Sequence, residues 1–393
     1  HRLRHSLIVG EVAFAMILLA AAGLFLRGLQ RFINADPGWQ VDGLVMAQMS
    51  LQGEKYADEK PRVVFLNQLE ERLRTLPGVQ HVAVAVSQPV FGFGSSFGFR
   101  IEGQPEPPPD KIPETFIEPV SDDYFQTLGA RVQQGRTFNS SDTADHPKVM
   151  IINETLARSF WPNESPIGKR ITNNGNVKTV YEVVGVVNDI SFPGVLGEPY
   201  TKFASFVPVA QAAPDYVTLL VRTSSNSDAI ANSLRSAVAG LDPEQPVYRI
   251  RTARSAADDG VGNISLLGTL LGAFATIGII LAVIGIYGVV SYTVVQRTGE
   301  LGIRMALGAQ TGEVMWFVLR KGAVLVLIGV FLGAFGAYGV SKLLISTIPS
   351  LPTRDPLMLL FSALILMAVA LVACYIPARR ATRVNPLVAL KGE

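Results

Sequence analysis

The residues whose types and spacing could support catalysis are few. Gly94-Ser-Ser-Phe-Gly98 fits the G-x-S-x-G pattern, which presents Ser96 as a hydrolase nucleophile. That chemistry needs a strand, a sharp turn and a helix around the serine, followed by an acid and then a histidine. Here the stretch leads into another strand-like run, and the only later histidine is His146. We therefore expect a flexible loop. The alternative, a membrane-anchored hydrolase, would show esterase activity that is lost on Ser96→Ala.

Phosphate and metal sites have as little support. Gly168-Lys169 matches the end of a phosphate-binding loop, but Asn163 stands where the first glycine should be. The pairs Asp122-Asp123 and Asp258-Asp259 could ligate calcium, although isolated pairs are more often solvated turns or helix caps. The single cysteine, Cys374, and the scattered histidines lack zinc spacing. We expect no catalytic, cofactor or metal site, and no binding and hydrolysis of ATP by the chain itself.

Composition indicates a membrane protein with a large polar part. The 393 residues are 49% hydrophobic and only 17% charged, which is too apolar for an ordinary soluble enzyme and too polar for a chain lying wholly in lipid. At ~150 residues per domain, two or three units are expected. The net charge of +2 is too near zero to indicate a nucleic-acid partner.

Four segments are long and apolar enough to cross a membrane, which takes ~20 residues. They are 6–26, 264–295, 322–341 and 357–376. The second has no formal charge and exceeds one membrane thickness, so we expect it to tilt or to continue beyond the bilayer as a stalk. Glu11, in the first segment, could be a functional intramembrane carboxylate. It could instead snorkel to the nearer membrane face or pair with Arg4.

Basic residues predict the orientation of these segments, because cytoplasmic loops are rich in Lys and Arg. Such residues cluster at the N-terminus, between the second and third segments, and after the fourth, whereas the connection between the third and fourth has only Arg354. We therefore expect both termini and the 296–321 connector to lie in the cytoplasm. The large region between the first two segments then lies outside.

Residues 30–262 have the patterns of a water-soluble α/β domain. Two strand-helix-strand units recur in it, at 43–51, 61–75 and 79–86 and again at 216–222, 227–240 and 246–252. The region between them shows strand patterns at 114–120, 149–152 and 179–188 and a short helix at 154–160. We expect a split β-α-β subdomain with a second, mainly β subdomain inserted at about 91–213.

Small residues recur in the second and third apolar segments. Small side chains allow helix backbones to approach closely in lipid, although glycine is also simply common in membrane helices. The candidate helix-packing positions in the second segment are Gly272, Gly278, Gly285 and Gly288. The third segment continues the pattern with Gly329, Gly333 and Gly339.

The connector between these segments is charged and amphipathic. Glu300 and Arg304 are four residues apart with the acid first, which favours a helical ion pair. One interpretation is an interfacial helix resting on lipid headgroups. The other is a docking helix inserted into a groove of a cytoplasmic protein. The residues alone do not decide between them.

Three motifs resemble one known family. The run Gln296-Arg-Thr-Gly-Glu-Leu-Gly-Ile-Arg-Met-Ala-Leu-Gly-Ala309 and the tail 376–390 resemble FtsX-like permeases, the membrane subunits of type VII ABC transporters. Residues 151–171 resemble the extracytoplasmic core domain of MacB-like proteins. The resemblance implies an integral membrane protein with four transmembrane helices and a large extracytoplasmic α/β domain, in which the split subdomain corresponds to the family's Porter part and the insert to its Sabre part.

The implied domain division is a first transmembrane helix at 1–29, the core domain at 30–262 and an FtsX-like permease domain at 263–393. The last contains a cytoplasmic coupling helix at about 296–320 and a cytoplasmic tail at 377–393. The coupling helix would dock an ATPase through Glu300, Leu301, Ile303, Arg304, Ala306, Gly308 and Ala309. ATP would be bound by that separate partner, so that the chain itself needs no cofactor.

The resemblance further implies the bacterial inner (cytoplasmic) membrane and, besides lipid, two kinds of protein partner. One is a second permease copy or, because the chain starts at His1 without methionine, the missing half of a tandem permease. The other is a membrane-fusion protein. The expected function is export of a peptide, antibiotic or lipoprotein-type substrate by mechanical transmission. The alternative is a non-transporting signal relay that activates a cell-wall hydrolase.

Overall fold

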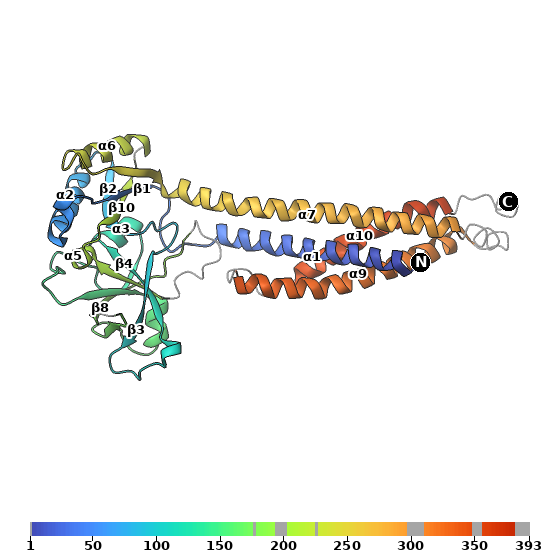
Figure 1. Ribbon diagram of the computed structural model, residues 1–393, viewed down its shortest axis with the longest axis horizontal. Helices are drawn as coiled ribbons and strands as arrows, with labels where there is room; N and C mark the ends of the chain where they lie inside the picture. Colours follow the sequence, from blue (N-terminus) through green and yellow to red (C-terminus); the bar gives the residue numbers. More distant parts are fainter. Residues whose placement is uncertain are drawn as a thin grey trace. The chain divides into compact units, whose positions relative to one another are not determined.

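The structure is a computed structural model that describes residues 2–175, 178–192, 203–224, 227–296, 310–347 and 356–381. Its contacts divide the chain into two compact units. We call Ile33–Gly262 the α/β unit, and His1–Phe32 together with Asn263–Glu393 the helical unit. Figure 1 labels the elements of both.

Four long helices confirm the predicted spans. They are α1 (Arg2–Ile33), α7 (Ala253–Gln296), α9 (Thr311–Thr347) and α10 (Pro356–Ala381). Each contains a stretch that is long and apolar enough to cross a membrane. At 1.5 Å per residue the 44-residue α7 is ~66 Å long, about twice the ~30 Å hydrocarbon core, so it exceeds one membrane thickness as the sequence predicted.

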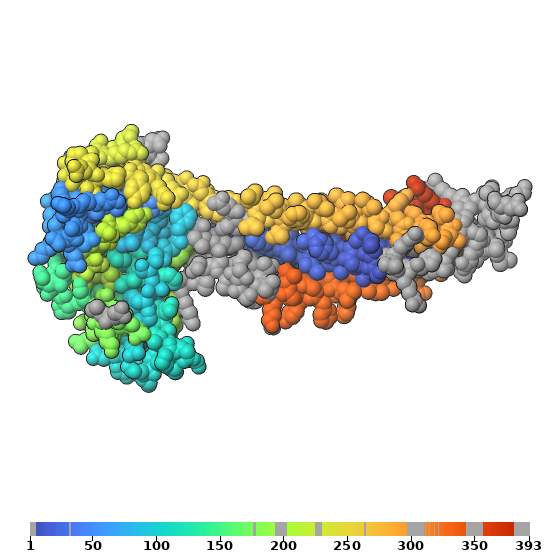
Figure 2. Space-filling model, in the orientation of Figure 1, coloured from blue at the N-terminus to red at the C-terminus, as the bar shows by residue number. Residues whose placement is uncertain are grey.

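Within the helical unit, α1 packs against both α7 and α9. Its buried residues Val12 and Met16 belong to one apolar cluster with Ile286 of α7 and Val326 of α9. In Figure 2, α1, in blue, lies between these two helices. Outward-facing side chains of the same helices, such as Phe335 at 68% exposure, are also apolar. Apolar residues on the outer surface as well as in the core are typical of helices that face lipid.

The first part of the α/β unit is an antiparallel sheet, which we call the sheet part. Its elements are β1 (Leu44–Ser50), α2 (Glu59–Arg74), β2 (Val79–Ala85), β10 (Tyr216–Thr223), α6 (Ser227–Ala239) and β11 (Val247–Thr252). The strand order is β11-β1-β10-β2, so strands from the two predicted β-α-β units alternate in one sheet. Helices α2 and α6 pack on one side of it over a shared apolar core (Figure 1).

The inserted strands form the second part, which we call the ring part. Its strands are β3 (Ser95–Ile101), β4 (Glu114–Val120), β5 (Val132–Gly135), β6 (Val149–Asn153), β7 (Arg170–Asn173), β8 (Val180–Val187) and β9 (Ala204–Pro208). Pairing runs β4-β3-β7-β8-β6-β9, and β9 pairs back onto β4 in parallel. Six strands therefore close into a ring, which leaves few free edges. The predicted mainly β character of the insert is confirmed, but its closure was not foreseen.

Short helices and single helical turns complete the α/β unit. They are η1 (Glu54–Tyr56), η2 (Pro109–Lys111), α3 (Tyr124–Leu128), α4 (Glu154–Phe160) and α5 (Val209–Ala212). The α4 helix has the predicted bounds and begins at an Asn153 cap, whose side chain accepts a hydrogen bond from the Leu156 N–H.

The expected loop at residues 94–98 is wrong, because β3 begins at Ser95. Ser96 pairs with Phe116 of β4 in an antiparallel ladder, and the strand continues on to pair with β7. A serine inside a regular strand lacks the turn that exposes a nucleophile. The side chain of His146 hydrogen-bonds to the hydroxyl of Thr143 at 2.9 Å. These placements remove the support for hydrolase chemistry at Ser96.

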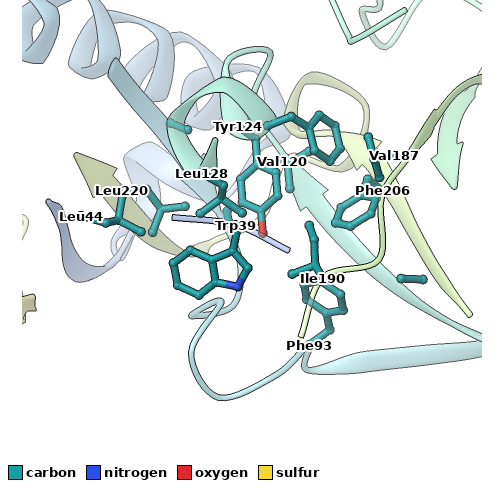
Figure 3. Packing of buried hydrophobic residues seen from close by; sticks show 14 of the residues in the cluster. Trp39, Leu44, Phe93, Val120, Tyr124, Leu128, Val187, Ile190, Phe206 and Leu220 are labelled. Carbon is teal, nitrogen blue, oxygen red and sulfur yellow. The ribbon is translucent and has the colours of Figure 1, made fainter. Parts of the chain in front are cut away.

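An aromatic cluster joins the two parts of the α/β unit. Trp39, Phe93, Tyr124 and Phe206 are all buried in it, together with Leu44 of the sheet part. Figure 3 shows these side chains converging. The rings of Phe93 and Phe206 meet edge to face with centroids 5.5 Å apart, a favourable arrangement for aromatic pairs.

Candidate functional site

The predicted docking residues Glu300, Leu301, Ile303, Arg304, Ala306, Gly308 and Ala309 lie outside the described residues. The description resumes at Gln310, whose carbonyl accepts the Glu313 N–H at 3.0 Å as α9 begins. The docking assignment therefore stays a prediction.

Two of the four candidate glycines of α7 face α1. A Cβ on Gly278 would lie 3.5 Å from the Cα of Ala15, and a Cβ on Gly285 would overlap the carboxylate of Glu11. Around Gly272 and Gly288, no atom of the described residues lies within 4 Å of such a Cβ. Of the four candidates, Gly278 and Gly285 therefore lie where α7 approaches α1 closely, as does Gly268, whose Cβ would lie 3.1 Å from the Phe25 ring.

Glycines of α9 also approach α1 closely, and at two of them the nearest atoms include its backbone. A Cβ on Gly329 would lie 2.7 Å from the Cβ of Val12, and one on Gly333 would lie 2.5 Å from the Cβ of Met16. These distances are too short for any side chain, so the contact between α1 and α9 requires glycine at both positions.

Glu11 lies at the α1–α7 contact, against Gly285. Its Oε2 atom is buried and has no hydrogen-bond partner among the residues that the structure describes. The side chain of Arg4 lies outside the description, so the predicted pairing with Arg4 is not tested. A carboxylate oxygen facing into a helix bundle is costly in lipid, which makes Glu11 a candidate functional residue.

In the α/β unit, residues 34–43 connect α1 to β1, and we call this segment the linker. The linker is bonded to the ring part. The indole N–H of Trp39 donates to the Ser191 carbonyl at 2.9 Å, and the Asn188 side-chain amide donates to the Gly38 carbonyl at 2.8 Å. The Ser191 N–H donates in turn to the Pro37 carbonyl. The linker therefore adds onto residues 188–191, which follow strand β8.

Helix α7, in contrast, continues directly from the sheet part. It begins at Ala253, one residue after β11 ends, and Ala253 is fully buried in the aromatic cluster. In its first turn, the guanidinium of Arg254 binds Asp42 of the linker through two bonds of 2.8 and 2.9 Å. The hydrogen bond from Arg254 lowers the pKa of the Asp42 carboxyl. This ion pair joins the linker to the start of α7.

Arg222, in β10, is hydrogen-bonded to the same linker. It is 7% exposed, and its guanidinium donates to the carbonyls of Gln40, Asp42, Thr127 and Leu128. Burial lowers its pKa. In the sequence, Arg222 is only the last residue of the predicted strand 216–222. The one sign of its role as a buried hydrogen-bond donor is that a single arginine ends the mainly apolar run 216–221.

One residue from the phosphate-loop candidate and one from each aspartate pair is engaged in an ion pair. Lys169 binds Glu164 at 2.8 Å, Asp123 binds Arg74 at 2.9 Å, and Asp259 lies 3.8 Å from Arg251. Among the described residues, no group of three or more His, Cys, Asp or Glu side chains is placed to hold a metal ion.

The chain combines four membrane-spanning helices with a large α/β unit, and the linker and the start of α7 connect them. These features define a membrane protein of the permease class. The chain matches the MacB-like periplasmic core domain over residues 7–237 and the FtsX-like permease C-terminal domain over residues 272–386. The first match covers more than half of the chain, which therefore belongs to the family of FtsX-like ABC transporter permeases with a MacB-like core domain, with the α/β unit as its extracellular domain.

Two relatives illustrate the family. The chain is 25% identical over 285 residues to the uncharacterized ABC transporter permease YknZ of Bacillus subtilis, covering 70% of each protein. It is 28% identical over 289 residues to the macrolide export ATP-binding/permease protein MacB 1 of Yersinia pestis, covering 70% of this chain and 43% of that protein. The chain thus spans less than half the length of this macrolide export relative.

Solved structures also resemble the chain, at low identity. The periplasmic region of MacB from Actinobacillus actinomycetemcomitans aligns with a TM-score of 0.38 and 17% identity, covering 58% of this chain and 97% of that one. The extracellular domain of YknZ from Gram-positive bacteria aligns with a TM-score of 0.33 and 17% identity, covering 52% and 100%.

Proposed function

We propose that the chain couples ATP hydrolysis by a separate cytoplasmic ATPase to a change of shape in its extracellular α/β unit. Family membership supports a permease subunit. The observation that carries the mechanical part is the double attachment of the α/β unit. The linker after α1 is bonded to the ring part at Ser191 before it enters β1 of the sheet part, whereas α7 continues directly from β11 of the sheet part. A displacement of the linker relative to α7 would therefore exert a force between the ring part and the sheet part.

The steps of the cycle follow from this attachment. The partner ATPase would move the coupling helix at about 296–320 within the permease domain, 263–393, and α7 would carry the displacement to β11. Such a shift requires the ATPase to bind the two states of the permease with unequal affinity. The Asp42–Arg254 ion pair sets how far the linker follows α7. No step requires a reactive group of this chain, so the proposed role is non-enzymatic.

The proposal includes location, partners and cargo. The chain would lie in the inner membrane of a bacterial cell and work with a second permease copy or tandem half, and with a membrane-fusion protein. One relative is a macrolide export protein, which favours an antibiotic among the expected peptide, antibiotic and lipoprotein cargoes.

Arg304→Glu tests the docking of the ATPase. Reversing a charge at a docking arginine removes a hot-spot contact of about 2 kcal/mol or more, so affinity for the ATPase should fall by roughly thirtyfold. The measurement is co-purification of the ATPase with the permease from membranes. Arg320→Glu, a reversal outside the docking set, serves as the control. Equal recovery of the ATPase with both variants would disprove the docking assignment.

Asp42→Arg tests the mechanical coupling separately. The two side chains are 78% and 54% exposed, so loss of the ion pair should change the free energy of unfolding by less than about 1 kcal/mol. ATP turnover of the reconstituted complex should nevertheless fall about two- to thirtyfold, the range of coupling energies of 0.5–2 kcal/mol. The double variant Asp42→Arg with Arg254→Asp should recover turnover. A double variant no better than the single one would refute the coupling role.

A further inference from the structure

The sheet part and the ring part are joined by a narrow strand junction. Strands β2 and β4 share one residue pair, Ala85 with Val120, whereas β2 and β10 share six. Two backbone hydrogen bonds flank this pair. The Val86 N–H donates to the Pro119 carbonyl at 3.3 Å, and the Ser121 N–H donates to the Val84 carbonyl at 2.8 Å.

Two side chains complete the junction. The Ser87 N–H donates to Oε1 of Glu118 at 2.6 Å, and the Val84 N–H donates to the hydroxyl of Ser121 at 2.9 Å. Half of the hydrogen bonds from β2 to the end of β4 therefore use a side chain of β4 or of the residue after it. Glu118 is only 1% exposed, and its Oε2 has no partner among the described residues.

A second buried carboxyl supports the same junction from α2. Glu70, which is 6% exposed, lies beside the side chain of Ser121, and its Oε1 has no hydrogen-bond partner among the described residues. Arg74 lies 3.3 Å from the Glu70 carboxylate and also binds Asp123 at 2.9 Å. Each of the two carboxyls therefore lies beside a residue that holds β2 against β4.

Few titratable or charged groups lie near the two carboxyls of Glu118 and Glu70. Tyr124, itself fully buried, is the titratable side chain that interacts with Glu118. Around Glu70 the charged groups are Arg74, Asp122 and Asp123. Burial raises the pKa of Glu118 to about 7 and that of Glu70 to about 7.

We propose that Glu118 and Glu70 form a proton-sensitive latch, which closes the β2–β4 junction when protonated and loosens it when ionised. The latch would regulate the shape change of the α/β unit, so its physiological use rests on the proposed function. Its chemistry does not, because opening of the junction can be measured without ATP or a partner.

The direction follows from proton binding. In the closed junction each carboxyl has a pKa near 7, and in an opened, hydrated junction the pKa returns to its ordinary value near 4.5. The closed state therefore binds protons more tightly and is favoured at acid pH. Between pH 6 and pH 8, the ratio of closed to open junctions should fall about tenfold for each carboxyl.

Amide hydrogen exchange of the full chain in lipid nanodiscs tests the latch. Exchange at residues 84–87 and 118–121, corrected for the intrinsic effect of pH, reports the open fraction. We expect it to rise about tenfold for each carboxyl, or roughly a hundredfold in all, between pH 6 and pH 8, and to stay level at 149–153 in β6. Glu118→Gln and Glu70→Gln should each reduce this pH-dependent rise in exchange by about tenfold. Glu114→Gln, an exposed carboxyl on the same strand, should remove none.

Two results would overturn the latch. One is corrected exchange at the junction that does not change with pH. The other is a pH dependence that both glutamine variants retain. If Glu118→Gln fails to fold, Glu70→Gln alone decides, because it must still reduce the pH dependence by about tenfold. Exchange that rises equally across the whole α/β unit would show general destabilisation and would also refute a local latch.

Discussion

Arg222→Met is expected to lower the free energy of unfolding of the α/β unit by about 3–5 kcal/mol, because each buried acceptor left without a donor costs roughly 1–3 kcal/mol. Methionine matches the length of the aliphatic stem but donates no hydrogen bond. Four carbonyls, two in the linker and two at the end of α3, would lose the guanidinium donor. The Leu128 carbonyl would keep the hydrogen bond from the Gln40 N–H at 2.8 Å, so the cost falls on the other three.

Thermal unfolding of the full chain in detergent measures this effect. For a unit of this size, 3–5 kcal/mol corresponds to a fall in Tm of roughly 6–20 °C. Arg235→Met is the matched control, because Arg235 is exposed on α6 and, among the described residues, bonds to the Asn232 side chain at 3.2 Å. Its effect should stay within about 0.5 kcal/mol. Equal Tm values for the two variants would contradict the role given to Arg222.

Arg222→Lys separates charge from geometry. Lysine keeps the positive charge but has a single donor group and cannot reach four carbonyls in different directions at once. We expect it to recover less than half of the lost stability. Because Arg222 holds Gln40 and Asp42, both variants should also loosen the linker that carries the proposed mechanical coupling.

Periodicity in the sequence predicted the elements whose environment is uniform along their length. The alternation of apolar residues in 43–51 and 79–86 and the helical spacing between them gave β1, α2 and β2 to within about two residues. The four spans followed from hydropathy alone. In each case the pattern of apolar residues repeats over the element or over its apolar stretch, so local pattern and final structure agree there.

Long-range pairing could not be predicted in the same way. Closure of the ring depends on β9 lying parallel to β4, with Phe206 beside Glu118, almost ninety residues away along the chain. No local pattern specifies that partner. The loop expected at Ser96 became a strand for the same reason, since glycine and serine are poor strand formers and only the flanking β4 and β7 fix their conformation.

The candidate site shows the same limit at single residues. Glycine positions in α7 were apparent from the sequence, but which of them face α1 depends on the rotation of the helix. Gly278 and Gly285 face α1, and Gly272 and Gly288 do not. Likewise, Glu118 looked like an ordinary polar residue of an alternating strand. It is buried where β4 pairs with β9, which brings Phe206 beside it from a distant part of the chain.

Gly333→Ala is expected to destabilise the helical unit more than any other addition of a single methyl group to it. The new Cβ would lie 2.5 Å from the Cβ of Met16 and 2.8 Å from the carbonyl oxygen of Ala13, and a backbone atom cannot move aside as a flexible side chain can. Helix α9 would have to shift away from α1. Overpacking of this kind costs about 1–3 kcal/mol, partly offset by the ~1 kcal/mol better helix propensity of alanine.

Gly339→Ala provides the control within the same helix. No atom of the described residues lies within 4 Å of a Cβ at that position, so only the gain in helix propensity remains, and Tm should stay level or rise. The pair therefore separates packing from propensity with one identical substitution. If the two variants unfold at the same temperature in detergent, α1 and α9 do not meet at Gly333. If Gly333→Ala alone is destabilised, the displacement of α9 should also reduce ATP turnover in the reconstituted complex, because the first residues of α9 belong to the proposed coupling helix at about 296–320.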